Sequence, residues 1–167
     1  MYARGEHGED IISAAIRSSG FQTHRLTPNY LEPPKIVLDG MPYTLPDYLS
    51  WTEDELFYDE MKTMHCASYH RNTGVWEVGI KKKHLDDYRE VQRLTGIPVR
   101  VFVLLLCDGF TFPAEKARWI SEGRTLEPEI RWLPLDELDD IKRVGMDVRT
   151  KKPDSFVFWA YDQMRTL

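Results

Sequence analysis

The stretches LPDYLSW at residues 45–51 and LFYDEMKTM at residues 56–64 decide the fold class of this chain. In the second stretch apolar and polar residues alternate, which is typical of a β-strand with one buried face. The first stretch is a plausible short strand, and polar residues 52–55 between the two form a turn. The sequence therefore predicts two neighbouring strands joined like a hairpin.

The second of these strands presents two different faces, because successive side chains of a strand point in opposite directions. Tyr58, Glu60 and Lys62 share one face. Three residues that alternate with them point the other way: Phe57, Asp59 and Met61. A carboxylate and an ammonium group are therefore expected side by side on one face of the sheet.

Asp47 stands at the edge of the first strand, where pairing of the two strands lets it reach the same place as Glu60. Two carboxylates from neighbouring strands form the kind of oxygen site that Mg²⁺ takes together with phosphate oxygens and water. Lys62 beside them can orient an attacking water or neutralise charge that develops on a phosphate. Alone, Glu-x-Lys is most often a surface ion pair and Pro-Asp a turn; the combination in paired strands indicates a site.

Composition bounds the class of protein. The chain has 167 residues, of which 12% are aromatic and 29% charged, so we expect one domain over residues 1–167 and exclude disordered and collagen-like chains. No apolar run approaches the roughly 20 residues that span a bilayer, and no signal-peptide core follows Met1. Cys66 and Cys107 are too few for a disulfide scaffold, which predicts reduced thiols in a cytoplasmic protein.

Charge is unevenly spread along the chain. The net charge of −5 does not favour a surface that binds polyanions. However, residues 1–61 carry 4 basic against 11 acidic side chains, whereas residues 62–100 carry 8 against 4. An acidic segment followed by a basic one suits a site that holds cations beside an anionic substrate, and a solvated helix face is the commoner alternative.

The same patterns predict the remaining elements. Apolar residues at helical spacing, or a proline start, predict helices over residues 6–19, 82–94 and 113–122. Apolar β-rich runs predict strands over residues 98–106 and 130–133, and a last strand or short helix over residues 156–161. Residues 27–46 are expected to form a proline-rich loop with short extended pieces, and residues 63–79 form a long polar insert with a turn signal at residues 72–74. This order predicts an α/β fold, a mixed central sheet with helices on its faces.

Pro46-Asp47 and Glu60-Met61-Lys62 resemble the signature of the PD-(D/E)XK nucleases, the superfamily of many restriction enzymes and archaeal-type Holliday junction resolvases. Residues 76–106 are similar to the helix and strand that follow this motif in small resolvase-like and phage members. The residues that fit that pattern are Tyr88, Thr95, Gly96, Pro98 and Val99. The resemblance covers roughly residues 5–106, and residues 107–167 are a C-terminal extension that it does not place.

The resemblance implies a restriction-endonuclease-like core of αβββαβ type, with the strand that carries Glu60 in the middle of a mixed sheet. It also implies a Mg²⁺-dependent endonuclease, with Mn²⁺ as the alternative ion, that hydrolyses DNA phosphodiester bonds and leaves a 5′-phosphate. In that scheme Asp47 and Glu60 hold the metal, with the carbonyl of Met61 as a further ligand. Lys62 positions the water, and Glu9 of the acidic first helix is a candidate additional ligand.

Basic residues near this motif are candidates for gripping the DNA backbone without regard to sequence: Arg71, Lys81, Lys82 and Lys83. Positive charge at a helix N-terminus is electrostatically unfavourable, which favours a role in binding over simple solvation of the helix. Gln92 lies on the same helix and is a further candidate for DNA contact, because nuclease-fold helices often place a Gln or Lys near the site. The expected partner is branched or duplex DNA, and no membrane partner is expected.

Two other functions stay open. The first is a catalytically inactive nuclease-fold protein that binds DNA or protein as an accessory factor or inhibitor, which the acidic net charge favours. The second is a nuclease directed at RNA. The sequence also leaves open whether the chain forms a homodimer, although cleavage of two strands usually needs two active centres.

Overall fold

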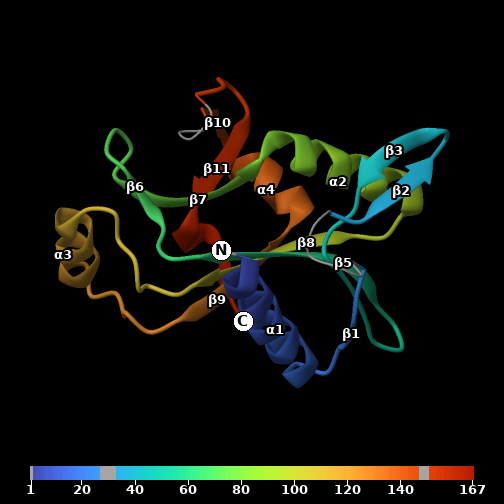
Figure 1. Ribbon diagram of the computed structural model, residues 1–167, viewed down its shortest axis with the longest axis horizontal. Coiled ribbons are helices and arrows are strands. Elements are labelled where there is room, and N and C mark those ends of the chain that lie inside the picture. The colour runs from blue at the N-terminus through green and yellow to red at the C-terminus, as the bar shows by residue number, and fades with distance from the viewer. Residues whose placement is uncertain (1, 27–32, 147–150) are drawn as a thin grey trace.

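The computed structural model describes residues 2–26, 33–146 and 151–167 (Figure 1). Its helices are α1 (Tyr2–Ser18), α2 (Lys82–Thr95), α3 (Pro113–Ser121) and α4 (Leu135–Ile141), with a 3₁₀ turn η1 (Tyr161–Gln163). Its strands are β1 (Gln22–Arg25), β2 (Lys35–Leu38), β3 (Met41–Thr44), β4 (Tyr48–Trp51), β5 (Leu56–Met64), β6 (Ser68–His70), β7 (Val75–Lys81), β8 (Val99–Leu105), β9 (Glu129–Pro134), β10 (Arg143–Gly145), β11 (Phe156–Ala160) and β12 (Arg165–Thr166). None of the helices in these ranges is long and apolar enough to cross a membrane.

The larger sheet has six strands in the order β1-β4-β5-β8-β9-β12. β5 and β8 run parallel, and the other neighbouring strands are antiparallel. β8 is buried along its whole length, as its continuous apolar run predicts. The expected mixed sheet is confirmed, and β5, the strand that carries Glu60, lies in its interior.

Helices cover both faces of this sheet (Figure 1). α1 packs on one face through Ile12 and Ile16, which join a buried cluster with side chains of the sheet: Tyr48, Met61, Phe102 and Leu104. α2 packs on the opposite face through a buried stripe at helical spacing: Leu85, Tyr88 and Val91. α2 ends where Gly96 adopts a left-handed conformation (φ 70°) and donates its N–H to the carbonyl of Gln92, as the sequence predicts.

A second sheet has four strands in the order β10-β11-β7-β6. Residues 63–79, which the sequence indicates only as a long polar insert, contain β6 and most of β7. Trp76 and Val78 of β7 are each only 1% exposed. Gly79 of β7 must be a glycine because of packing: a Cβ atom there would lie 2.7 Å from the backbone carbonyl oxygen of Val157 in β11.

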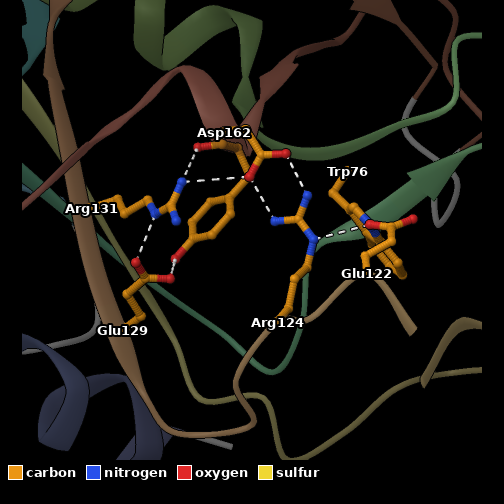
Figure 2. A network of polar contacts seen from close by, with 7 residues as sticks. Trp76, Glu122, Arg124, Glu129, Arg131 and Asp162 are labelled. Atoms are coloured by element: carbon orange, nitrogen blue, oxygen red, sulfur yellow. Dashed lines mark hydrogen bonds and ion pairs between the residues drawn. The ribbon is translucent and has the colours of Figure 1, made fainter. Parts of the chain in front are cut away.

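The C-terminal segment contributes to both sheets, with β9 and β12 in the larger one and β10 and β11 in the smaller one. Figure 2 shows the polar network that anchors it. Arg124 donates to both carboxylate oxygens of Asp162 at 2.5 and 2.6 Å and to Glu122 at 3.1 Å. Trp76 also donates to Glu122, at 2.8 Å, and Arg131 lies 3.5 Å from Asp162. This network ties β7, the segment after α3 and η1 together.

Candidate active site

The predicted hairpin of β4 and β5 is confirmed, and its register determines where Asp47 lies beside β5. The antiparallel register runs from Trp51 opposite Leu56 to Tyr48 opposite Asp59. β5 continues past this point, and Asp47, the residue before β4, occupies the position beside it. Oδ2 of Asp47 accepts a hydrogen bond of 3.1 Å from the backbone N–H of Met61. Asp47 therefore satisfies a β5 donor where β4 has ended, and its carboxylate is held against the strand.

Met61 also directs a carbonyl group toward this side of β5. The N–H and C=O of a strand residue point toward the same neighbouring strand. Because the N–H of Met61 binds Asp47, its carbonyl oxygen faces the same side. The side chain of Met61 is buried in the cluster under α1, so only its backbone is available to the site.

Glu60 and Lys62 lie side by side, as the alternation of β5 predicts. Lys62 Nζ lies 2.5 Å from Oε1 of Glu60, in an ion pair whose Glu60 side chain is only 1% exposed. Oε2 of Glu60 accepts a hydrogen bond of 2.5 Å from the hydroxyl of Tyr88, a buried residue of α2. The expected division of faces is confirmed as well, since Tyr58 packs in the core under α2 and Met61 in the cluster under α1.

Glu9 approaches this cluster from α1. It forms an ion pair with Arg25 of β1, and both side chains are largely buried. Burial raises the pKa of the Glu9 carboxyl, Arg25 opposes this shift, and the nearby Glu60 carboxylate adds to it. Glu9 of α1 therefore interacts electrostatically with Glu60 and Lys62 of β5 and with Asp47, the residue before β4.

The charges of the cluster are not balanced. Burial and then the Glu60 carboxylate raise the pKa of Asp47 well above its ordinary value, while Lys62 and the Met61 N–H lower it. Burial lowers the pKa of Lys62, but the carboxylates of Glu60, Asp47 and Glu9 outweigh this effect and raise it above its ordinary value. Lys62 thus remains protonated, and its ammonium group interacts electrostatically with three carboxyl groups, of which Glu60 is in contact with it.

This arrangement fits a divalent cation held by oxygen atoms. Within the described residues, no three or more His, Cys, Asp or Glu side chains already surround one point. However, Oε1 of Glu60 is buried and receives no hydrogen bond of normal geometry, although it touches the Lys62 ammonium. Mg²⁺ typically takes one or two carboxylates and keeps several waters, so a closed protein cage is not required. Asp47, Glu60 and the Met61 carbonyl can supply such an open set of oxygens.

The predicted DNA-contacting residues divide into two groups. Three of them are exposed: Arg71 in the turn between β6 and β7, Lys81 at the end of β7 and Lys83 in the first turn of α2. Lys82 forms an ion pair of 2.5 Å with Asp86, one turn further along α2. The prediction that these basic residues contact DNA stays a prediction.

Gln92 has a structural use that the sequence did not reveal. Its Oε1 accepts a hydrogen bond of 2.8 Å from the N–H of Val99 at the start of β8. Its Nε2 donates to Asp136 of α4 at 2.6 Å. Both ends of the amide are therefore engaged within the protein, and the contact of Gln92 with DNA stays a prediction.

Tyr88, Arg25 and His84 belong to the surroundings of the site but were not predicted as parts of it. His84 of α2 stacks edge-on against Tyr88 with ring centroids 6.3 Å apart. Burial lowers the pKa of His84, and the charges of Glu60 and Lys62 both act on it. The sequence feature that could have indicated His84 and Tyr88 is their helical spacing, which places them one turn apart on one face of α2.

Comparison with known proteins identifies the fold. No protein-family model matches the chain, and no curated protein matches it by sequence. Among solved structures, it is similar to Hjc of Archaeoglobus fulgidus, a Holliday junction resolvase, with a TM-score of 0.53 over 95% of this chain and 89% of that one. The chain has a restriction-endonuclease-like fold. Sequence identity to the resolvase is only 10%, so this likeness concerns the fold and does not by itself transfer an activity.

Proposed function

We propose that the chain is a metal-dependent endonuclease that hydrolyses phosphodiester bonds in DNA, with a resolvase-like preference for branched duplexes. The observation that carries this proposal is the convergence on one side of β5 of the Asp47 carboxylate, bound to the Met61 N–H, and the Glu60–Lys62 ion pair. The resolvase-like fold supports the choice of DNA as substrate.

Asp47, Glu60 and the Met61 carbonyl would hold Mg²⁺, or Mn²⁺ in its place, and Glu9 would add a carboxylate from α1. When bound, such an ion neutralises charge on the phosphate and makes a bound water more acidic. The buried carboxyl groups of the cluster repel one another, and a divalent charge relieves that repulsion.

Lys62 acts on the reacting phosphate in this proposal. The Lys62 side chain is 35% exposed and its protonated ammonium group is fixed by Glu60, so it can orient the attacking water and donate to a phosphate oxygen. The water oxygen forms a bond to phosphorus while the bond to the 3′ oxygen breaks. The attacking water gives up a proton to solvent and the leaving 3′ oxygen takes one up, so the products are a 5′-phosphate and a 3′-hydroxyl group.

Exposed basic residues between β6 and the first turn of α2 would bind the flanking strands. Arg71, Lys81 and Lys83 carry positive charge on the segment that leads from β6 into α2. Contacts of this kind bind phosphates without reading the bases. They would hold an anionic duplex even though the whole chain has a net charge of −5.

The proposal is tested by incubating the purified chain with four-way junction, linear duplex, nicked duplex and RNA in the presence of Mg²⁺, Mn²⁺ or EDTA. Cleavage of DNA that depends on the metal, ends in 5′-phosphates and is lost in Lys62→Ala supports it. Lys116→Ala, which removes an exposed lysine of α3, is the matched control and should cleave like the wild type. Equal behaviour of wild type and Lys62→Ala would show that this site is not catalytic.

A second candidate is a binding protein of the same fold without activity. The net charge of −5 favours it. Tight, metal-independent binding to junction DNA with no cleavage under any of these conditions would identify this second function.

A further inference from the structure

Gly8 of α1 lies directly against β5 at Thr63. A Cβ atom at position 8 would lie 1.8 Å from Oγ1, 2.7 Å from Cβ and 2.8 Å from Cγ2 of Thr63. Rotation of the Thr63 side chain can move Oγ1 and Cγ2, but Cβ is fixed by the backbone of β5. Any side chain at position 8 therefore forces α1 and β5 apart.

Backbone conformation gives no reason for glycine at this position. Gly8 is not among the described glycines with a positive φ, and it lies within the helix. Glycine is the least favourable residue in a helix interior after proline. Close packing of α1 on β5 is therefore the physical reason for Gly8.

The residue that follows is Glu9, and the distance between α1 and β5 decides where its carboxylate lies. Glu9 pairs with Arg25 of β1, and Arg25 lies opposite Tyr48, the first residue of β4. The ion pair therefore holds the Glu9 side chain near the start of β4. Glu60 and Lys62 of β5 lie close enough to interact electrostatically with it. An outward movement of α1 would carry Glu9 away from both.

We infer that Gly8 is a positioning residue for the active site: by lacking a side chain, it seats α1 on Thr63 and brings the Glu9 carboxylate to the ion held by Asp47 and Glu60. This inference rests on the proposed function, because it gives Glu9 the role of a ligand. Gly8 itself touches no substrate and no ion.

The test measures Mn²⁺ affinity by calorimetry and junction cleavage for Gly8→Ala, Glu9→Gln and the double variant. Gly8→Ala should weaken Mn²⁺ binding about tenfold, the lower end of the loss seen when groups that orient metal ligands are removed. Because Gly8 acts through Glu9, the double variant should bind no more weakly than Glu9→Gln alone. Additive losses would overturn the inference.

Two further variants separate positioning from general destabilisation. Gly8→Ala/Thr63→Gly removes all three contacting atoms and should restore Mn²⁺ affinity, whereas Gly8→Ala/Thr63→Ala leaves the contact of 2.7 Å and should not. Ile16→Val, buried on the same helix, should lower the Tm and leave Mn²⁺ affinity unchanged. If Gly8→Ala fails to fold, the Thr63→Gly double variant decides: wild-type affinity supports the inference, and weak affinity contradicts it.

Different results would refute the role of Gly8 and the nuclease function. The predicted pattern of Mn²⁺ affinities with no DNA cleavage would support the role of Gly8 and refute the nuclease function. Normal cleavage and Mn²⁺ binding by Gly8→Ala would refute the role of Gly8 and leave the nuclease function standing. A wild-type chain that binds no Mn²⁺ would refute both.

Discussion

The hydroxyl of Tyr88 donates a hydrogen bond of 2.5 Å to Oε2 of Glu60, and both side chains are buried to within 1% exposure. The other oxygen of Glu60 faces Lys62. The two oxygens of one carboxylate therefore have different partners, one from α2 and one from β5. This fixes the orientation of Glu60 and connects the packing of α2 to the geometry of the candidate active site.

Tyr88→Phe should lower both stability and activity. It leaves Oε2 of Glu60 buried without its donor, which costs about 1–3 kcal/mol in the free energy of unfolding. Loss of the orientation of Glu60 should also lower the cleavage rate about tenfold or more. Urea denaturation and a junction cleavage assay measure the two effects.

Tyr161→Phe is the matched control, because buried Tyr161 donates to the carboxylate of Glu129 at 3.1 Å in another part of the fold. It should cost stability and leave cleavage unchanged. If Tyr88→Phe cleaves as fast as Tyr161→Phe, the contact with Glu60 has no role in catalysis.

Asp47→Asn should change the response of the protein to Mg²⁺. Without metal the variant should melt at a higher temperature than wild type, because it removes a carboxylate that burial and Glu60 destabilise. Mg²⁺ at one hundred times its dissociation constant should stabilise wild type by about 2.7 kcal/mol and the variant much less. Thermal melts in EDTA and in Mg²⁺ check both expectations, with the exposed Asp54→Asn as control. Equal Mg²⁺ shifts in all three proteins would place the ion elsewhere.

Lys81→Gln/Lys83→Gln should reduce the dependence of DNA affinity on salt. Each phosphate contact contributes about 0.9 to the slope of log affinity against log salt, so loss of two contacts should lower the slope by about 2. Lys82→Gln should have a smaller effect, since Lys82 is already paired with Asp86. Affinities measured by fluorescence anisotropy from low to high salt test this, and an unchanged slope would remove the start of α2 from the DNA interface.

The C-terminal network should weaken in acid. Hydrogen bonds from Arg124, opposed by partial burial, hold the pKa of Asp162 below its ordinary value of 3.8. A carboxyl group with a lowered pKa stabilises the fold above its unfolded pKa and loses this contribution as the pH falls through the folded pKa. The Tm difference between wild type and Asp162→Asn should therefore shrink as the pH falls below about 4. A difference that stays constant from pH 7 to pH 3 would show that the ion pair does not stabilise the protein.

The sequence alone was sufficient to predict the paired strands β4 and β5 and the two faces of β5, because the alternation of side chains is a local property of a strand. It also placed α1, α2, α3, β8 and β9 close to their observed positions. It could not predict contacts between distant elements. The pairing of Arg100 with Asp59 across β5 and β8, at 2.8 Å, depends on a parallel register that no local pattern encodes.

β6 and β7 were missed because the polar turn between them and their charged neighbours obscured a short alternation. Trp76 and Val78 lie on one face of β7, but the strand contains Gly79, and a glycine inside a strand pattern weakens the prediction of a strand. The structural contact of Gln92 could not be predicted for a related reason: an amide on a helix looks the same in sequence whether or not it binds the N–H of Val99.

The most direct test of the account is a crystal soaked in Mn²⁺ and measured at a wavelength where manganese scatters anomalously. The account predicts an anomalous peak at coordination distance from carboxylate oxygens of both Asp47 and Glu60, absent in Asp47→Asn crystals. A fully soaked crystal with no peak between these two side chains, or with manganese only elsewhere, would contradict the central claim.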